Sequence, residues 1–155
     1  MTCTIVTGML TASTTKENWG NMAQKQRILI TILELYRQGY TDFYVNCERG
    51  VSLWAAEAVC LLKKTLKIEL HIIVPFENQC EEWLESERDR YYKVHEAADS
   101  VTFACRQFQP DCYQIADSLM INHSDFLLVF GKKTLACYAV TLASQAGVPV
   151  QHIPI

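Results

Sequence analysis

The feature that most constrains the fold of this chain is a regular alternation between short apolar segments and longer amphipathic ones. The segment 126–130 reads Phe-Leu-Leu-Val-Phe and is apolar at every position, which is typical of a parallel strand covered by helices on both faces. Residues 22–40 instead place Ile28, Ile32 and Leu35 on one side at helical spacing. Strands that alternate with long helices indicate βαβ units, whose right-handed crossovers cover both faces of a sheet.

The same alternation extends over the whole sequence. The pattern predicts strands at 3–8, 42–46, 68–74, 100–104, 125–130 and 148–153, and helices at 22–40, 51–66, 80–98, 111–123 and 134–146. We therefore predict one α/β domain over residues 1–155, a single Rossmann-like three-layer domain with a mainly parallel sheet flanked by helices. Its first strand should lie in the middle of the sheet.

Charge and composition restrict the function classes. The net charge of −3 over 155 residues argues against a nucleic-acid binder that relies on bulk positive charge. No apolar run approaches the roughly 20 residues of a membrane span, and residues 1–8 lack the order of a signal peptide, so we expect a cytoplasmic protein without a membrane partner. The seven cysteines contain no CxxC pair and the four histidines show no metal-ligand spacing, so we predict reduced thiols, no metal site and no required cofactor.

Ligands of open parallel sheets bind beyond the carboxyl ends of the strands, and three predicted strand ends carry suitable residues. The first is Thr7-Gly8, where glycine permits a sharp turn and close approach of a ligand. The second is the loop 47–52, in which Gly50 opens a helix whose N-terminus attracts anions, while Ser52 and Arg49 could bind phosphate. The simpler interpretation is that Ser52 caps the helix and Arg49 is solvated.

The third strand end and its neighbours complete the predicted site. Residues 130–134 again join a strand, a glycine and a helix, although exposed lysines in such a turn are ordinary. The segment 75–77 closes another strand as a side wall, and a basic residue at 106 follows the next strand. The predicted ligand-binding residues are Thr7, Gly8, Arg49, Gly50, Ser52, Pro75, Phe76, Glu77, Arg106, Gly131 and Thr134.

The segment 50–58, Gly-Val-Ser-Leu-Trp-Ala-Ala-Glu-Ala, carries a family resemblance. Together with Thr7-Gly8, residues 75–77 and the segment 124–130, it resembles the YpsA family of the SLOG superfamily of Rossmann-like domains, which also includes the DNA-processing protein DprA and the LOG phosphoribohydrolases. The resemblance implies a nucleotide or nucleotide-derived ligand at the strand ends. Two departures stand out: Asn46-Cys47 replaces the family's Ser-Gly, and Ser52 replaces its acidic residue.

Four functions remain to be compared. A small-nucleotide binding or sensing domain is favoured, because the loop glycines are retained. An N-glycosidic hydrolase of nucleoside monophosphates is weakened by the loss of the acid at Ser52 and of the PGGxGTxxE signature, and an interaction module that has lost its ligand is the third alternative. Single-stranded DNA binding is disfavoured by the acidic charge. A homo-oligomer is expected because one small domain carries many large aromatic side chains: Trp19, Trp54, Trp83, Tyr91 and Tyr92.

Overall fold

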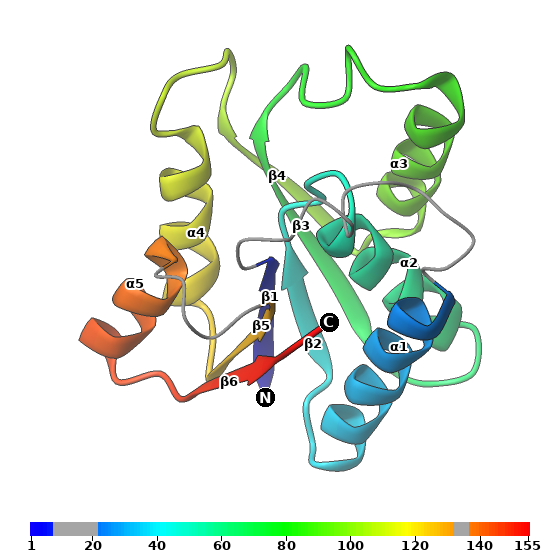
Figure 1. Ribbon diagram of the computed structural model, residues 1–155, viewed down its shortest axis with the longest axis vertical. Helices are drawn as coiled ribbons and strands as arrows, with labels where there is room; N and C mark the ends of the chain where they lie inside the picture. Colours follow the sequence, from blue (N-terminus) through cyan, green and yellow to red (C-terminus); the bar gives the residue numbers. More distant parts are fainter. Residues whose placement is uncertain (8–21, 132–136) are drawn as a thin grey trace.

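The computed structural model describes residues 1–7, 22–131 and 137–155, which form a parallel sheet with helices on both faces (Figure 1). The strands are β1 (Thr2–Thr7), β2 (Asp42–Val45), β3 (Glu69–Phe76), β4 (Ser100–Cys105), β5 (Phe126–Phe130) and β6 (Val150–Ile153). The helices are α1 (Met22–Arg37), α2 (Val51–Lys63), α3 (Glu85–Ala97), α4 (Cys112–Asn122) and α5 (Tyr138–Ala146).

The strand order is β4-β3-β2-β1-β5-β6, and every neighbouring pair is parallel. The predicted Rossmann-like α/β class is therefore confirmed, with β1 in the middle of the sheet. The chain first runs outward from β1 to β4 and then returns to β5 on the other side of β1. This reversal creates a topological switch point between β1 and β5, where sheets of this kind hold their ligands.

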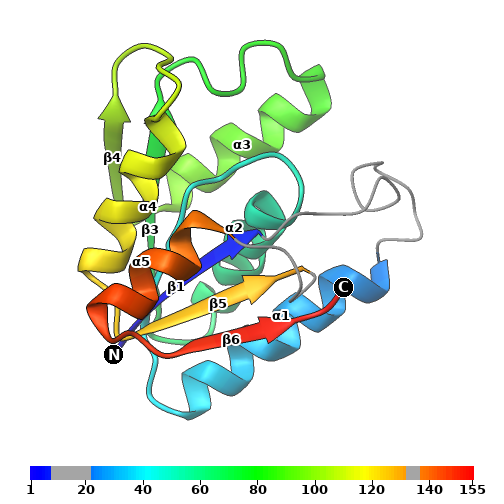
Figure 2. The same cartoon turned by 60° about the vertical axis from the view of Figure 1, so that its left-hand side comes forward.

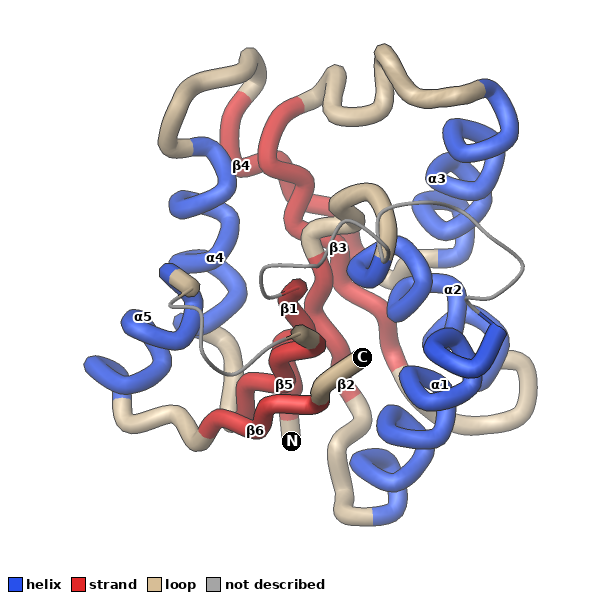
Figure 3. The backbone as a smooth tube through the Cα atoms, in the orientation of Figure 1, coloured by secondary structure: helices blue, strands red, loops and turns tan. Residues whose placement is uncertain are grey.

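The two faces of the sheet have separate cores. Helices α1, α2 and α3 cover one face, and α4 and α5 cover the other (Figures 2 and 3). Successive side chains of a strand point to opposite faces, so Leu128 and Phe130 of β5 belong to the first core and Leu127 and Val129 to the second. This double burial is the reason that β5 is apolar at every position.

Several predicted boundaries are wrong. The helices expected over 22–40 and 51–66 end at Arg37 and Lys63. The helix expected over 80–98 begins only at Glu85, because the preceding residues form turns in which Gln79, Glu81 and Trp83 donate their backbone N–H groups to carbonyls three residues earlier. Pro75 does not stop β3, which continues to Phe76 and pairs there with Cys105 of β4. Within the described residues, no helix has the length and apolar character needed to cross a membrane.

Candidate functional site

The carboxyl ends of β1, β2 and β5 lie side by side at one edge of the sheet, in the middle of the view in Figure 1. Thr7 ends β1, Gly50 precedes α2, and Gly131 follows β5, where its amide donates to Ile153 O at 2.9 Å. The fold thus brings these three predicted residues to the same edge. The predicted residues Gly8 and Thr134 lie outside the described residues.

The Thr7 hydroxyl is the first sign of a binding function at this edge. Its Oγ1 atom is buried and has no hydrogen-bond partner among the residues that the structure describes. A buried hydroxyl without a partner costs on the order of 1–3 kcal/mol. A ligand oxygen at the switch point would satisfy it.

The loop before α2 has a backbone that only glycine adopts readily. Gly50 has φ +97° and ψ −126°, and a Cβ atom added there would find no heavy atom within 4 Å. The amides of Leu53 and Trp54 already donate to the carbonyls of Glu48 and Gly50, so among the described residues the first two amides of α2 remain as donors for an anion. Gly50 therefore combines open space with the positive end of a helix.

Ser52 has a structural partner within the protein. Its side chain is fully buried, and its Oγ donates to Asn46 Oδ1 at 2.8 Å, which also accepts the Glu48 amide at 2.9 Å. Asn46 in turn accepts a bond at its backbone oxygen from Gln79 Nε2 at 3.1 Å. The hydroxyl of Ser52 is therefore turned into the loop and holds its shape.

We expect Ser52→Ala to lower the free energy of unfolding by about 1–2 kcal/mol, because a buried hydrogen bond is lost. Affinity for any nucleotide that binds at this edge should stay within about twofold of the parent, since the Ser52 hydroxyl is already bonded to Asn46 Oδ1. Urea unfolding and calorimetry would measure both quantities. The matched control is Ser118→Ala, which removes an exposed hydroxyl that only bonds Gln114 O in its own helix; a tenfold loss of nucleotide affinity in Ser52→Ala alone would contradict this assignment.

Arg49 is also held by the protein. Its guanidinium makes a two-point ion pair with Glu87 of α3, with Nε–Oε2 at 2.8 Å and Nη2–Oε1 at 2.9 Å. The Glu87 side chain is only 2% exposed, whereas that of Arg49 is 52% exposed. Because a buried carboxylate needs a partner, this pair fixes the loop to α3, and Arg49 is accounted for without any ligand.

A polar hollow of about 450 Å³ lies beyond the ends of β3 and β4. It gathers Arg49, Phe76 and Arg106 from the predicted set, together with the aromatic ring of Phe108, whose centroid lies 5.3 Å from that of Phe76. Glu77 is exposed and its amide donates to Arg106 O at 3.4 Å, while Pro75 is buried. The side-wall residues thus join the two loops around this hollow.

Sequence reasoning missed two carboxyl groups at the same edge. Burial raises the pKa of Glu48, and burial followed by the negative charge of Glu48 raises the pKa of Asp117 in α4 to about 7. A buried carboxyl group with a strongly raised pKa, as for Asp117, is a candidate for ligand binding or acid–base chemistry. Glu48 was recognisable as the acid two residues before Gly50, whereas Asp117 gave no signal beyond its place beside the buried Ala116.

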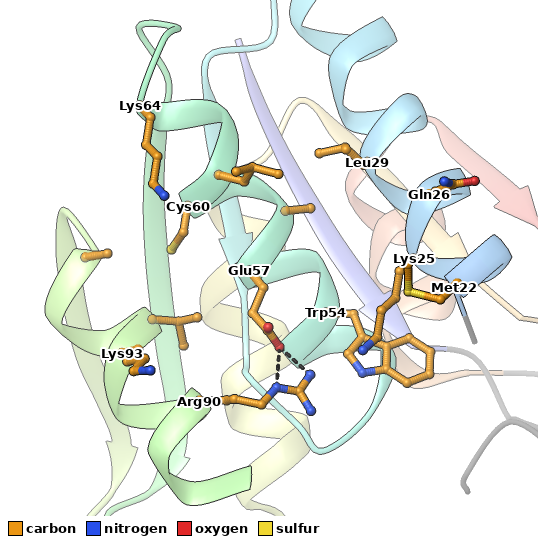
Figure 4. A pocket seen from close by; sticks show the side chains of 14 residues that line it. Met22, Lys25, Gln26, Leu29, Trp54, Glu57, Cys60, Lys64, Arg90 and Lys93 are labelled. Atoms are coloured by element: carbon orange, nitrogen blue, oxygen red, sulfur yellow. Dashed lines mark hydrogen bonds and ion pairs between the residues drawn. The ribbon is translucent and has the colours of Figure 1, made fainter. Parts of the chain in front are cut away.

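A larger groove of about 600 Å³ lies between α1, α2 and α3, away from the predicted residues (Figure 4). The Arg90–Glu57 ion pair, with Nε–Oε1 at 3.1 Å, crosses it, and Lys25 Nζ lies 5.3 Å from the Trp54 ring centroid. None of the predicted ligand-binding residues lines this groove.

The strand order and the residues at the carboxyl ends of the strands define a Rossmann-like α/β domain. Polar residues lie at its switch point. The chain belongs to the YpsA family, described as the YspA SLOG family, whose model matches residues 15–143. The predicted family resemblance is therefore confirmed.

Similar proteins include the UPF0398 protein BH1768 of Halalkalibacterium halodurans, 37% identical over 101 residues, which are 63% of this chain and 53% of that protein. The UPF0398 protein SaurJH9_1506 of Staphylococcus aureus strain JH9 is 31% identical over 108 residues, 68% of this chain and 58% of that protein. The chain thus aligns with little more than half the length of these relatives.

A solved structure gives an independent likeness. DNA processing protein A from Helicobacter pylori, whose structure concerns its single-stranded DNA binding mode, superposes with a TM-score of 0.64 at 16% identity. The similarity covers 100% of this chain and 66% of that chain. At this identity the likeness shows the fold.

Proposed function

We propose that this domain binds a small nucleotide or nucleotide-derived molecule at the carboxyl edge of β1, β2 and β5. The observation that carries the proposal is the open glycine backbone at the start of α2, at the same edge as the Thr7 hydroxyl, which has no partner among the described residues. A phosphate fits the helix N-terminus because free amides and the helix dipole both favour an anion. Gly50 leaves the space that this approach requires.

The carboxyl groups of Glu48 and Asp117 would recognise the ribose of the nucleotide. The loss of an acid at position 52 removed one acceptor for ribose hydroxyls, but Glu48 and Asp117 offer acceptors at the same edge. The raised pKa of Asp117, about 7, lowers the negative charge that a phosphate meets there near neutral pH. The rings of Phe76 and Phe108 offer an aromatic wall for a base.

The same carboxyl groups favour one alternative, an N-glycosidic hydrolase acting on nucleoside monophosphates. A carboxyl group with a pKa of about 7, as for Asp117, can donate a proton to a leaving base near neutral pH. A neighbouring acid then completes the pair that glycosidic cleavage uses. Liquid chromatography of nucleoside monophosphates incubated with the protein would detect the released base.

The test of the proposal is a thermal-shift screen over nucleoside monophosphates, diphosphates and dinucleotides, because a ligand that binds the folded state raises the melting temperature. Calorimetry then measures the affinity of any nucleotide that stabilises the parent. We expect Glu48→Gln to weaken that nucleotide by about tenfold, since one charge-assisted hydrogen bond to the ribose is worth about 1.5 kcal/mol.

The matched control is Glu57→Gln, which makes the same change on the groove side of α2, where Glu57 pairs with Arg90. Its nucleotide affinity should equal that of the parent. The proposal fails if no nucleotide stabilises the parent, an outcome that favours the interaction-module alternative. Equal weakening by both variants would place the nucleotide elsewhere.

A further inference from the structure

A second polar cluster lies at the amino ends of β2 and β3, far along the strands from the nucleotide edge. Parallel pairing aligns Asp42 with Glu69 and Tyr44 with His71. Because residues two apart on a strand share a face and paired residues point the same way, Asp42, Glu69 and His71 all project from one face of the sheet. The fold, not side-chain flexibility, brings them together.

Two donor separations within this cluster, which are also hydrogen-bond and ion-pair contacts, fit a metal-ligand set. His71 Nε2 lies 3.0 Å from Asp42 Oδ1 and 3.3 Å from Glu69 Oε2, and one donor atom from each of the three side chains lies within 4.8 Å of the others. Two donors bound at about 2.1 Å lie roughly 3.0 Å apart at right angles and roughly 3.4 Å apart in a tetrahedron. Both measured separations fall in this interval.

The imidazole is also oriented by its neighbours. His71 Nδ1 lies 2.6 Å from Ser100 Oγ on β4, and the Tyr44 ring stacks on it at a centroid separation of 4.7 Å. His71 Nε2 shares a hydrogen bond with Asp42 Oδ1 at 3.0 Å. With Nδ1 donating to Ser100, a cation that replaces the Nε2 proton would meet the Nε2 lone pair between the two carboxyl groups. Metal-binding histidines are held by such an outer hydrogen bond, which fixes the tautomer.

We propose that Asp42, Glu69 and His71 form a binding site for a divalent transition-metal ion such as Zn²⁺. Two carboxylates and one imidazole carry a net negative charge that a divalent cation neutralises. The nitrogen ligand favours Zn²⁺ over Mg²⁺, which takes oxygen ligands and keeps much of its water. The side-chain exposures of 14% for His71, 33% for Asp42 and 56% for Glu69 leave the ion open to solvent on one side, where water completes the coordination.

The site was not visible in the sequence because its ligands come from two strands. Asp42 and Glu69 are separated by 27 residues, and only the strand register places them side by side. His123 is not among the side chains whose donor atoms lie within 4.8 Å of one another, although its ring also stacks on Tyr44, at 5.7 Å. His123 therefore serves as a histidine of similar setting outside the ligand set.

The experiment is isothermal titration of the full chain with ZnSO₄ under reducing conditions. We expect one saturable Zn²⁺ site in the parent, a loss of affinity of at least about tenfold in His71→Ala and in Glu69→Gln, and no change in His123→Ala. Glu69→Gln keeps the test valid if His71→Ala is misfolded, because the Glu69 side chain is 56% exposed. Circular dichroism confirms folding of each variant.

Thiols are the competing ligands, since Cys105 and Cys112 lie close enough to share a hydrogen bond. Cys105→Ser should bind Zn²⁺ as the parent does, and Co²⁺ in the parent should show no thiolate charge-transfer band. Three results would overturn the proposal: no saturable Zn²⁺ binding, unchanged affinity in both ligand variants, or loss of binding in Cys105→Ser alone. In the first case Asp42, Glu69 and His71 form only a hydrogen-bonded polar cluster.

Discussion

Replacing Gly50 with aspartate is expected to abolish nucleotide binding. The new side chain would project into the space that is open beside the backbone, where a Cβ meets no heavy atom within 4 Å, and its carboxylate would repel a phosphate at the start of α2. The φ of +97° also strains any L-residue, so the free energy of unfolding should fall by about 1–3 kcal/mol. Calorimetry with a nucleotide that stabilises the parent measures the first effect and urea unfolding the second.

Gly147→Ala is the control that separates the effect of backbone strain from the loss of the proposed phosphate site. Gly147 ends α5 with φ +71°, and a Cβ there also finds no heavy atom within 4 Å, so alanine should cost about 1 kcal/mol of stability. Its nucleotide affinity should match that of the parent, because Gly147 follows the helix at its far end. If folded Gly50→Asp binds the nucleotide as tightly as the parent does, the ligand does not use the N-terminus of α2.

The layout of the sheet could be predicted because its signals are local. Helical spacing marks α1, and the apolar run of β5 indicates burial on both faces, so fold class and the central place of β1 follow from sequence. The start of α3 at Glu85 was missed because the charged segment before it suits a helix equally well. Tertiary hydrogen bonds favour turns in this segment instead, because the Gln79 side chain donates to the backbone carbonyl of Asn46.

The site was only partly predictable for a related reason. Gly50 is recognisable as a loop glycine between a strand and a helix, whereas the inward hydroxyl of Ser52 depends on the position of Asn46. The sequence suggests that Arg49 is a solvated cation. In the folded chain Glu87, 38 residues later, pairs with it. The raised pKa of Asp117 depends on burial and on the charge of Glu48, two properties that exist only in the folded chain.

Asp117→Asn is expected to stabilise the protein above neutral pH. The pKa of Asp117 rises from 3.8 to about 7 through burial and then through the charge of Glu48, so the folded state holds its proton more tightly than the unfolded state does. For the parent, this lowers the free energy of unfolding progressively between about pH 4 and pH 7, and the full cost remains above that range. Asparagine cannot ionise, so the variant should escape this cost.

At about pH 8.5 the variant should exceed the parent by about 4 kcal/mol in free energy of unfolding, and at about pH 4 the difference should nearly vanish. Urea unfolding at both pH values measures this difference.

Asp99→Asn provides a control of opposite sign. Burial alone would raise the pKa of Asp99, but the Lys63 ammonium and the Leu70 amide outweigh burial and lower that pKa. Asp99 thus stabilises the fold above about pH 4, and Asp99→Asn should destabilise it at about pH 8.5. If Asp117→Asn gains no stability at the higher pH, the Asp117 carboxylate is well solvated, and its assignment as the proton donor of a glycosidic reaction fails with it.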